Sequence, residues 1–254
     1  MKKTALLLVA PALGISLVAM GAMPAMAHDG AHAYSTTLDE LNNSGATGEV
    51  WIDVEGTQAT VTVNASGLAA EFDGAAYPHV QHIHIGAQGT CPTMDADENG
   101  DGIISTTEGA ASYGAIGTTL SIGDADKSPD GALDLMSAPS GDTITYKETF
   151  DLSQDVLDSL ESGTAVVVVH GLDPATQPEG ATEPSDLVPE LPLAATSPAL
   201  CGALAMAPAG GVDTGVTTAG DNGGEMGFVA LGATLAAMTA AGIYVVRRRT
   251  VRDN

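Results

Sequence analysis

Three histidines have a type and a spacing that could hold a metal ion. His82 and His84 stand two residues apart in a predicted strand, so both side chains are expected on one face. His170 ends the valine run 166–169, and a neighbouring strand could bring it to that same face. Neutral imidazoles are good ligands for copper and zinc. The alternative is a hydrogen-bonded structural cluster, since a His-x-His pattern is short and common.

The stretch 97–108 fits the calcium-loop pattern D-x-[DN]-x-[DN]-G-x5-E at every fixed position. Such a loop binds calcium through side-chain oxygens, one backbone carbonyl and a closing glutamate, and Gly102 allows its sharp turn. The predicted ligands are Asp97, Asn99, Asp101, Ile103, Ser105 and Glu108. Only a short helix over 107–112 could follow, which favours a single structural clip over a paired calcium sensor. The alternative is a solvated acidic loop without an ion.

Two cysteines, Cys91 and Cys201, are expected to form a disulfide, because an even count in a secreted chain favours a bond. Closing a loop of roughly 100 residues stabilises a fold by about 4–5 kcal/mol in the chain-entropy model. The alternative, two free thiols, is disfavoured outside the cell.

The N-terminus predicts a secretory signal peptide over residues 1–27. Lys2 and Lys3 precede an apolar run, and Ala25-Met26-Ala27 offers small residues for cleavage before His28. After cleavage, the free amine and the imidazole of His28 could together chelate copper. The alternative for this start of the mature chain is a plain tail.

The C-terminus predicts a membrane anchor. Residues 227–246 carry no charge, and at ~1.5 Å per residue such a helix spans about 30 Å, the thickness of a bilayer core. The basic tail 247–254 is expected in the cytoplasm, which places residues 28–226 outside. Between the folded part 28–205 and the span, residues 206–225 are rich in Gly, Ala and Thr and predict a flexible stalk.

Thr214-Gly215, followed by an apolar span and an arginine cluster, resembles the sorting signal of Gram-positive surface proteins. In that family a sortase cuts the Thr-Gly bond and joins the new end to the cell wall. The usual Leu-Pro pair before the threonine is absent here. Attachment by a sortase and a plain stalk with a membrane anchor therefore both remain open.

Charge excludes one class of partner. Residues 28–225 hold 31 acidic and 2 basic residues, a formal net charge of −29. Such a surface repels phosphate backbones and attracts cations, so nucleic-acid binding is excluded.

Short alternating stretches predict an all-β fold around these sites. Residues 49–55 and 58–64 alternate polar and apolar, and Gly56-Thr57 joins them as a hairpin. Pro129-Asp130-Gly131 predicts another hairpin turn. Further strands are expected at 80–85, 117–122, 143–150 and 165–170, with one helix at 153–161. This pattern is typical of an antiparallel Greek-key β-sandwich or barrel, here with an inserted calcium loop.

The histidine stretches resemble a known family. His-Val-Gln-His-Ile-His-Ile-Gly at 79–86 is similar to the H-x-x-H-x-H strand of copper/zinc superoxide dismutases. Val-Val-Val-His-Gly at 167–171 resembles the strand that gives their last copper ligand. The resemblance implies copper ligands at His82, His84 and His170, with His79 as a neighbour behind them. It also implies the pairing of the two cysteines.

CHRD domains, named after chordin, have the same order of motifs, and the resemblance covers about residues 33–204. It implies an immunoglobulin-like or dismutase-like β-sandwich with a poorly defined activity. The dismutase pattern is incomplete, because no histidine lies between Cys91 and Tyr146 to bridge to a zinc ion. Pro198 stands where the dismutases have their catalytic arginine, and residues 28–225 contain no arginine to attract superoxide, an anion.

The leading hypothesis is a metal-binding CHRD-type domain at the cell surface, stabilised by calcium, without enzymatic activity and with a structural or interaction role. A second hypothesis is an extracellular copper-binding protein of superoxide dismutase type with weak or no dismutase activity. A third is a wall adhesin or matrix component in which acidity and calcium mediate contact between cells. Calcium is the expected cofactor and copper the second candidate, and no protein partner is indicated.

Overall fold

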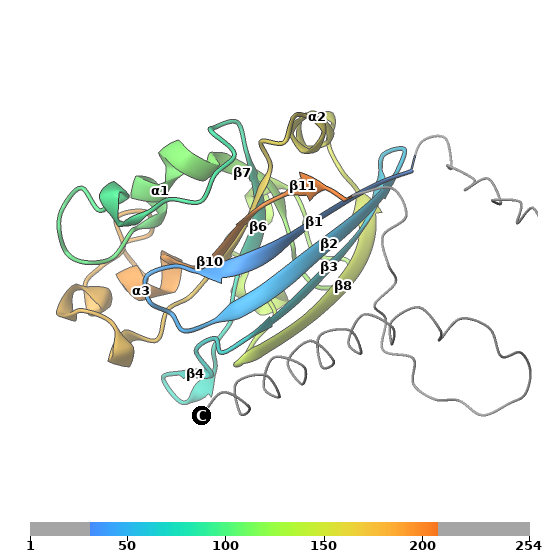
Figure 1. Ribbon diagram of the computed structural model, residues 1–254. Coiled ribbons are helices and arrows are strands. Elements are labelled where there is room, and N and C mark those ends of the chain that lie inside the picture. The colour runs from blue at the N-terminus through green and yellow to red at the C-terminus, as the bar shows by residue number, and fades with distance from the viewer. Residues whose placement is uncertain (1–30, 208–254) are drawn as a thin grey trace, which may run out of the picture. The chain divides into compact units, whose positions relative to one another are not determined.

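The computed structural model describes residues 31–207, which form a curled antiparallel sheet shaped like a half-barrel (Figure 1). Its strands run in the order β7-β6-β9-β10-β1-β2-β3-β8, and β11 also pairs with β1. The strands are β1 (Ala31–Glu40), β2 (Thr47–Glu55), β3 (Gln58–Ser66), β6 (Gln81–Ile85), β7 (Ala115–Thr119), β8 (Thr143–Asp151), β9 (Val166–His170), β10 (Pro198–Ala203) and β11 (Ala205–Met206), with a separate small pair of β4 (Glu71–Phe72) and β5 (Ala75–Ala76). The described residues are mostly β and the sheet is antiparallel, so this coarser part of the predicted fold class is confirmed.

One face of the sheet encloses the main core. On β2, Val50, Ile52 and Val54 are buried while their neighbours are exposed, as a half-buried strand requires. β9 differs, since all five of its residues are buried. Val167 and Val169 belong to the main core, whereas the alternate valines pack in a second small cluster on the opposite face. That opposite face must therefore be covered as well.

The sheet does not close into a barrel within residues 31–207. The predicted Greek-key β-sandwich or barrel is therefore confirmed only in part. β7 and β8 are the two ends of the strand order. Side chains of β8 reach the segment after β7 instead: the Tyr146 hydroxyl donates to the Ser121 carbonyl at 3.3 Å, and Glu148 accepts from the Gly123 amide at 2.9 Å.

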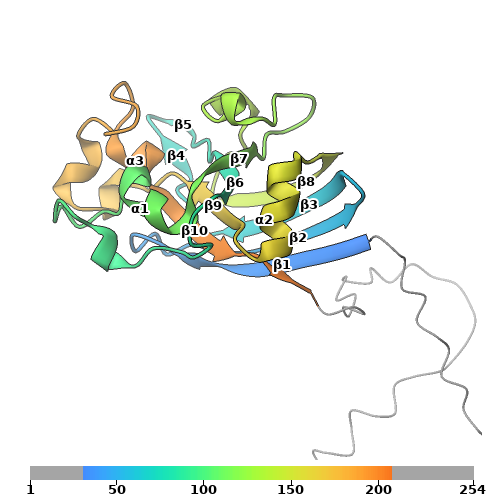
Figure 2. The ribbon, with the colours of Figure 1, turned by 90° about the horizontal axis from the view of Figure 1, so that it is seen from above.

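Three α-helices are present in the described part: α1 (Thr106–Tyr113), α2 (Gln154–Ser162) and α3 (Leu193–Thr196). Ser153 caps the start of α2, and Gly163, with a φ of 70°, ends it as its sequence predicts. α2, which Figure 2 shows from above, packs against β6, β7 and β11. Its buried residues Val156, Leu157 and Leu160 belong to the main core. α1 matches the short helix expected after the acidic loop.

Short 3₁₀ turns fill the long connections. They are η1 (Met94–Ala96), η2 (Pro129–Gly131), η3 (Leu135–Ser137), η4 (Pro174–Thr176) and η5 (Glu179–Thr182). η2 stands where a hairpin turn is predicted. The predicted hairpin turn is wrong, because residues 129–131 form a 3₁₀ turn and the strands on either side, β7 and β8, do not pair. The chain between them instead folds over the β6–β7 edge.

Two covalent and polar ties hold these connections to the sheet. Cys91 and Cys201 are bonded, so the segment after β6 is fixed to β10. Asn42, buried and at a φ of 54°, donates to the carbonyls of Ile104 and Pro198 and accepts from the Ile104 amide. It thereby joins the β1–β2 turn to the acidic loop and to β10.

Several predictions fall outside the described residues: the signal peptide 1–27, His28, most of the stalk 206–225, Thr214-Gly215, the span 227–246 and the tail 247–254. Met206, the first residue of the predicted stalk, belongs to β11 instead. Within residues 31–207 no helix has both the length and the apolar character needed to cross a membrane.

Candidate metal centre

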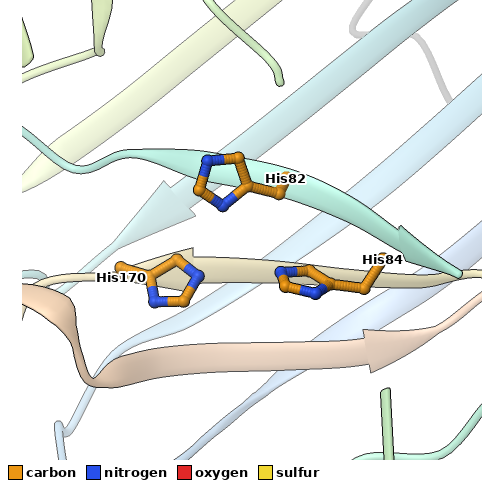
Figure 3. A group of neighbouring side chains, drawn as sticks. All are labelled: His82, His84 and His170. Carbon is orange, nitrogen blue, oxygen red and sulfur yellow. The ribbon is translucent and has the colours of Figure 1, made fainter. Parts of the chain in front are cut away.

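Two neighbouring strands bring the three histidines together (Figure 3). His82 and His84 lie on β6 and pair with Val168 and Val166 of β9. His170 follows Val168 by two residues, so it shares their face of the sheet. This is the face opposite the main core. The spacing of two and the valine run thus place the side chains as the sequence analysis expects.

The triad is compact and shielded from solvent. His82, His84 and His170 each offer one ring nitrogen such that these three atoms all lie within 4.8 Å of one another. The side chains are 3%, 1% and 3% exposed. Figure 3 shows the three rings turned toward a common centre. A single ion bound by three imidazole nitrogens fits such a spacing, because metal–nitrogen bonds are about 2.0–2.1 Å long.

Backbone carbonyls fix one nitrogen of each ring. Nδ1 of His84 lies 2.9 Å from the Gly114 carbonyl, and Nδ1 of His170 lies 2.7 Å from the Thr196 carbonyl. Nε2 of His82 lies 3.3 Å from the Ala132 carbonyl. A carbonyl oxygen only accepts, so these three nitrogens carry the ring hydrogens and donate.

The remaining nitrogens therefore hold lone pairs. His82 Nδ1, His84 Nε2 and His170 Nε2 are buried and have no hydrogen-bond partner in the described part of the chain. Leaving a buried polar atom unpaired costs about 1–3 kcal/mol. Metal-ligating histidines commonly donate their second ring N–H to a backbone carbonyl or carboxylate, which orients the ring and fixes its tautomer. The triad has this arrangement in all three members.

Burial keeps the three rings neutral. It lowers the pKa of His84 to about 4, and burial together with the neighbouring His84 lowers the pKa of His170 to about 3. The pKa of His82 lies well below its ordinary value because of burial first and the two neighbouring imidazoles second. Neutral imidazole is the form that binds metals, so the site needs no deprotonation near pH 7.

Helix α1 covers the triad on the sheet face opposite the main core. The Thr106 hydroxyl lies 3.3 Å from His170 Nδ1 and also donates to the Thr196 carbonyl. The Tyr113 ring packs edge-on against His84 with centroids 4.6 Å apart. Its hydroxyl donates to the Thr106 carbonyl at 2.8 Å. These supporting residues carry no sequence signal of their own, except that Thr106 lies in the acidic loop and Tyr113 follows it closely.

His79 stands behind His170 rather than in the triad. Its two ring nitrogens each lie 2.9 Å from a carbonyl, that of His170 and that of Ala69. Burial lowers its pKa, and the two hydrogen bonds partly oppose that shift. Gly171 has a φ of +107°, and a Cβ there would stand 2.7 Å from His79 Nδ1. His79 thus lies directly behind His170, which is the position that the dismutase resemblance implies for it.

In the predicted calcium loop, the carboxylates accept hydrogen bonds from backbone amides of the same loop. Asp97 accepts from the amides of Gly100 and Gly102 at 2.8 and 2.9 Å. Glu108 accepts from the Ser105 amide, and the Ser105 hydroxyl accepts from the Glu108 amide, which forms a capping box at the start of α1. The loop and the helix therefore share Glu108.

The other predicted calcium ligands lie in the same loop. Asn99 accepts from the Asp101 amide, and Asp101 accepts from the Ile103 amide, both at 2.8 Å. Ile103 is fully buried. The carboxylates of this loop do not form a cluster like that of the histidines. Within residues 31–207, the triad is the one group of His, Cys, Asp or Glu side chains in which three ligand atoms lie within 4.8 Å of one another.

Comparisons with known proteins add little beyond this geometry. No protein-family model matches the chain, and no curated protein sequence matches it. The resemblance to CHRD domains therefore stays a prediction. Among solved structures, a mutant of Candida albicans superoxide dismutase 5 (SOD5) is similar, with a TM-score of 0.39 and 13% sequence identity over 74% of this chain and 99% of that chain. Similarity of this size assigns neither fold nor function, and the case for a metal centre rests on the three histidines.

Proposed function

We propose that the protein binds one copper ion through His82 Nδ1, His84 Nε2 and His170 Nε2. The observation that carries this proposal is that these three nitrogens are buried, lie close together and have no partner in the described residues. An ion would satisfy all three at once. A purely structural cluster would instead leave them unpaired, at about 1–3 kcal/mol each.

Ligand chemistry favours copper. Imidazole suits copper, zinc, iron and nickel, and among divalent ions of the first row a given nitrogen site binds copper most tightly. The Cys91–Cys201 disulfide is consistent with an extracytoplasmic site, because such bonds persist in oxidising surroundings. Zinc is the competing ion, since it also accepts three histidines.

The charge of the protein favours copper binding over turnover of superoxide. Residues 31–207 contain no arginine, and Lys127 and Lys147 are their only lysines. Lys127 is held by the carbonyls of Ser121 and Gly123. A strongly negative surface repels a superoxide anion rather than steering it inward. We therefore expect weak or no dismutase activity and a role in holding copper.

Elemental analysis tests the copper proposal. The chain from His28 to Gly211 is secreted without a histidine tag, dialysed against trace copper and zinc, and analysed for metals per chain. We expect about one copper per chain, lost in His84→Gln and in His170→Gln. His32→Gln, an exposed histidine on β1, is the matched control and should keep it. Copper that persists in both triad variants and disappears on removal of His28 would overturn the proposal.

We also propose that loop 97–108 binds calcium as a structural clip. Support comes from the complete sequence pattern and from a loop already folded with its carboxylates turned onto its own amides. A carboxylate oxygen that accepts one hydrogen bond keeps a second lone pair, so these bonds do not prevent ligation. Extracellular calcium modules typically bind with dissociation constants of about 10⁻⁴–10⁻³ M.

Glu108→Gln separates the clip from the helix cap. Glu108 caps α1 and, in this proposal, would also ligate calcium, so the variant should lose some stability in chelator, about 0.5–2 kcal/mol, as capping residues do. The additional rise in melting temperature that calcium gives the wild type should disappear. Asp95→Asn, an exposed acidic residue just before the loop, should retain that rise. An equal calcium-dependent rise in Glu108→Gln would contradict the clip.

We propose a cell-surface location as well, with the signal peptide 1–27 removed and residues 227–246 in the membrane. Cleavage at Thr214-Gly215 by a sortase is the second route of attachment. Mass spectrometry of the mature protein distinguishes them: a chain that ends at Thr214 and is linked to wall peptide supports the sortase, and an intact C-terminus supports the anchor.

A further inference from the structure

An apolar cavity adjoins the triad. It has a volume of about 240 Å³, and His82 and His170 form part of its wall. The rest of the wall is almost entirely aliphatic and comes from the residue before β6, from β7, α1 and α3, and from two long connections. Its larger aliphatic members are Val80, Ile116, Leu133, Leu135, Leu187, Val188 and Leu191. No charged side chain lines it.

Two leucines mark the mouth of this cavity. Leu133, between η2 and η3, is 52% exposed, and Leu187, between η5 and α3, is 50% exposed. The cavity therefore runs from two exposed leucines to two buried histidines.

The polar groups in the wall are few and mostly occupied. The Thr106 hydroxyl donates to the Thr196 carbonyl, which also accepts from His170 Nδ1. The Thr196 hydroxyl pairs with Ser185. His82 Nδ1 and His170 Nε2 are the unpartnered polar atoms of the residues in this wall. A ligand thus meets apolar surface along its length, and the two buried nitrogens lie behind the wall at the histidine end of the cavity.

We propose that this cavity binds a small neutral molecule whose apolar body is about the size of one aromatic ring and whose single polar atom faces the triad. An apolar protein cavity of about 150 Å³ holds benzene, so 240 Å³ accommodates a ring with a short substituent. An anion would lose its hydration without gaining a charged partner in the wall. The net negative charge of the chain repels it further.

The position of the ligand's polar atom rests on the copper-site proposal. With copper bound, that atom would face the ion, and without copper it would face the imidazole lone pairs. Apolar binding itself needs no metal. Binding to the metal-free protein therefore tests the cavity, and the copper spectrum tests its connection to the triad.

Benzyl alcohol and benzoate form a matched pair of probes, because they share a ring and differ in charge at pH 7. Each is titrated into the same secreted chain, from His28 to Gly211. Binding is followed by ¹H–¹⁵N NMR in chelator. We expect benzyl alcohol to bind at least tenfold more tightly than benzoate. Equal or stronger binding of benzoate would overturn the proposal.

Two cavity-filling variants locate the site. Ala195→Phe and Val188→Phe each add a ring to the wall and should weaken benzyl alcohol binding at least tenfold. Met136→Phe, a residue 94% exposed on η3 and outside the wall, is the control and should leave binding unchanged. Unchanged binding in a folded filling variant would overturn the assignment.

With copper loaded, saturating benzyl alcohol should change the electron paramagnetic resonance spectrum of the ion in the wild type and not in Ala195→Phe. A spectrum unchanged in the wild type would remove the link to the triad. If the triad binds no copper, the copper proposal fails, while the NMR result still decides whether the cavity binds a neutral ring.

Discussion

The buried triad should make the metal-free protein unstable in acid, and the size of the effect follows from the pKa values. His84 and His170 have folded-state pKa values of about 4 and about 3, against 6.5 for a free histidine. Below pH 6.5 the unfolded chain binds protons that the folded chain does not, so folding stability falls as the pH falls. Above pH 6.5 the two histidines are mostly neutral in both the folded and the unfolded chain, so they no longer lower the folding stability.

Between pH 7.5 and pH 4.5 each of these two histidines should cost about 2.5 kcal/mol, and the pair about 5 kcal/mol. His82, whose pKa is lowered for the same reasons, adds to this loss. A typical domain has only about 5–15 kcal/mol of stability, so the metal-free protein is expected to lose most of it by pH 4.5.

Urea denaturation in chelator, followed by circular dichroism at both pH values, measures the loss. Carboxylates also titrate in this window, so the decisive quantity is the difference between wild type and a variant with one fewer buried imidazole. His170→Gln and His84→Gln should each reduce the pH-dependent loss by about 2.5 kcal/mol. A loss equal to that of the wild type in both variants would refute the assignment of neutral, buried histidines.

Other changes probe the ties around the triad. Cys91→Ser with Cys201→Ser should lower the free energy of unfolding by about 4–5 kcal/mol in urea denaturation, because the bond closes a loop of 110 residues; equal stabilities would refute it. Thr106→Val removes the hydroxyl beside His170 and should weaken copper affinity about tenfold, measured by competition with a chelator. Gly171→Ala should destabilise the fold by about 1–3 kcal/mol, measured by thermal unfolding, because alanine disfavours a φ of +107° and its Cβ would press on His79.

The sequence predicts those elements whose signals are local. Ser153 and Gly163 mark the two ends of α2, and the alternation of residues 49–64 predicts the β2–β3 hairpin. The spacing of His82 and His84 predicts their common face because strand geometry alone decides it. The place of His170 depends on which strands pair, but an all-valine strand has to lie beside other buried strands.

Elements that depend on distant partners leave weaker signals. β1 is absent from the prediction because its Ser-Thr-Thr stretch lacks clean alternation, although it joins β2 to β10 and β11. β10 begins at Pro198, a residue that disfavours strands away from an edge or an end. Ala132 and Thr196 support the triad only through their carbonyls, and every residue has a carbonyl. No side-chain pattern could have indicated them.

Anomalous diffraction from crystals grown with copper would locate the ion. We predict one strong copper peak within about 2.0–2.1 Å of His82 Nδ1, His84 Nε2 and His170 Nε2, with the three carbonyl hydrogen bonds behind the rings preserved. A triad without a peak, in crystals whose copper lies on other residues, would contradict it and leave the histidines as a structural cluster.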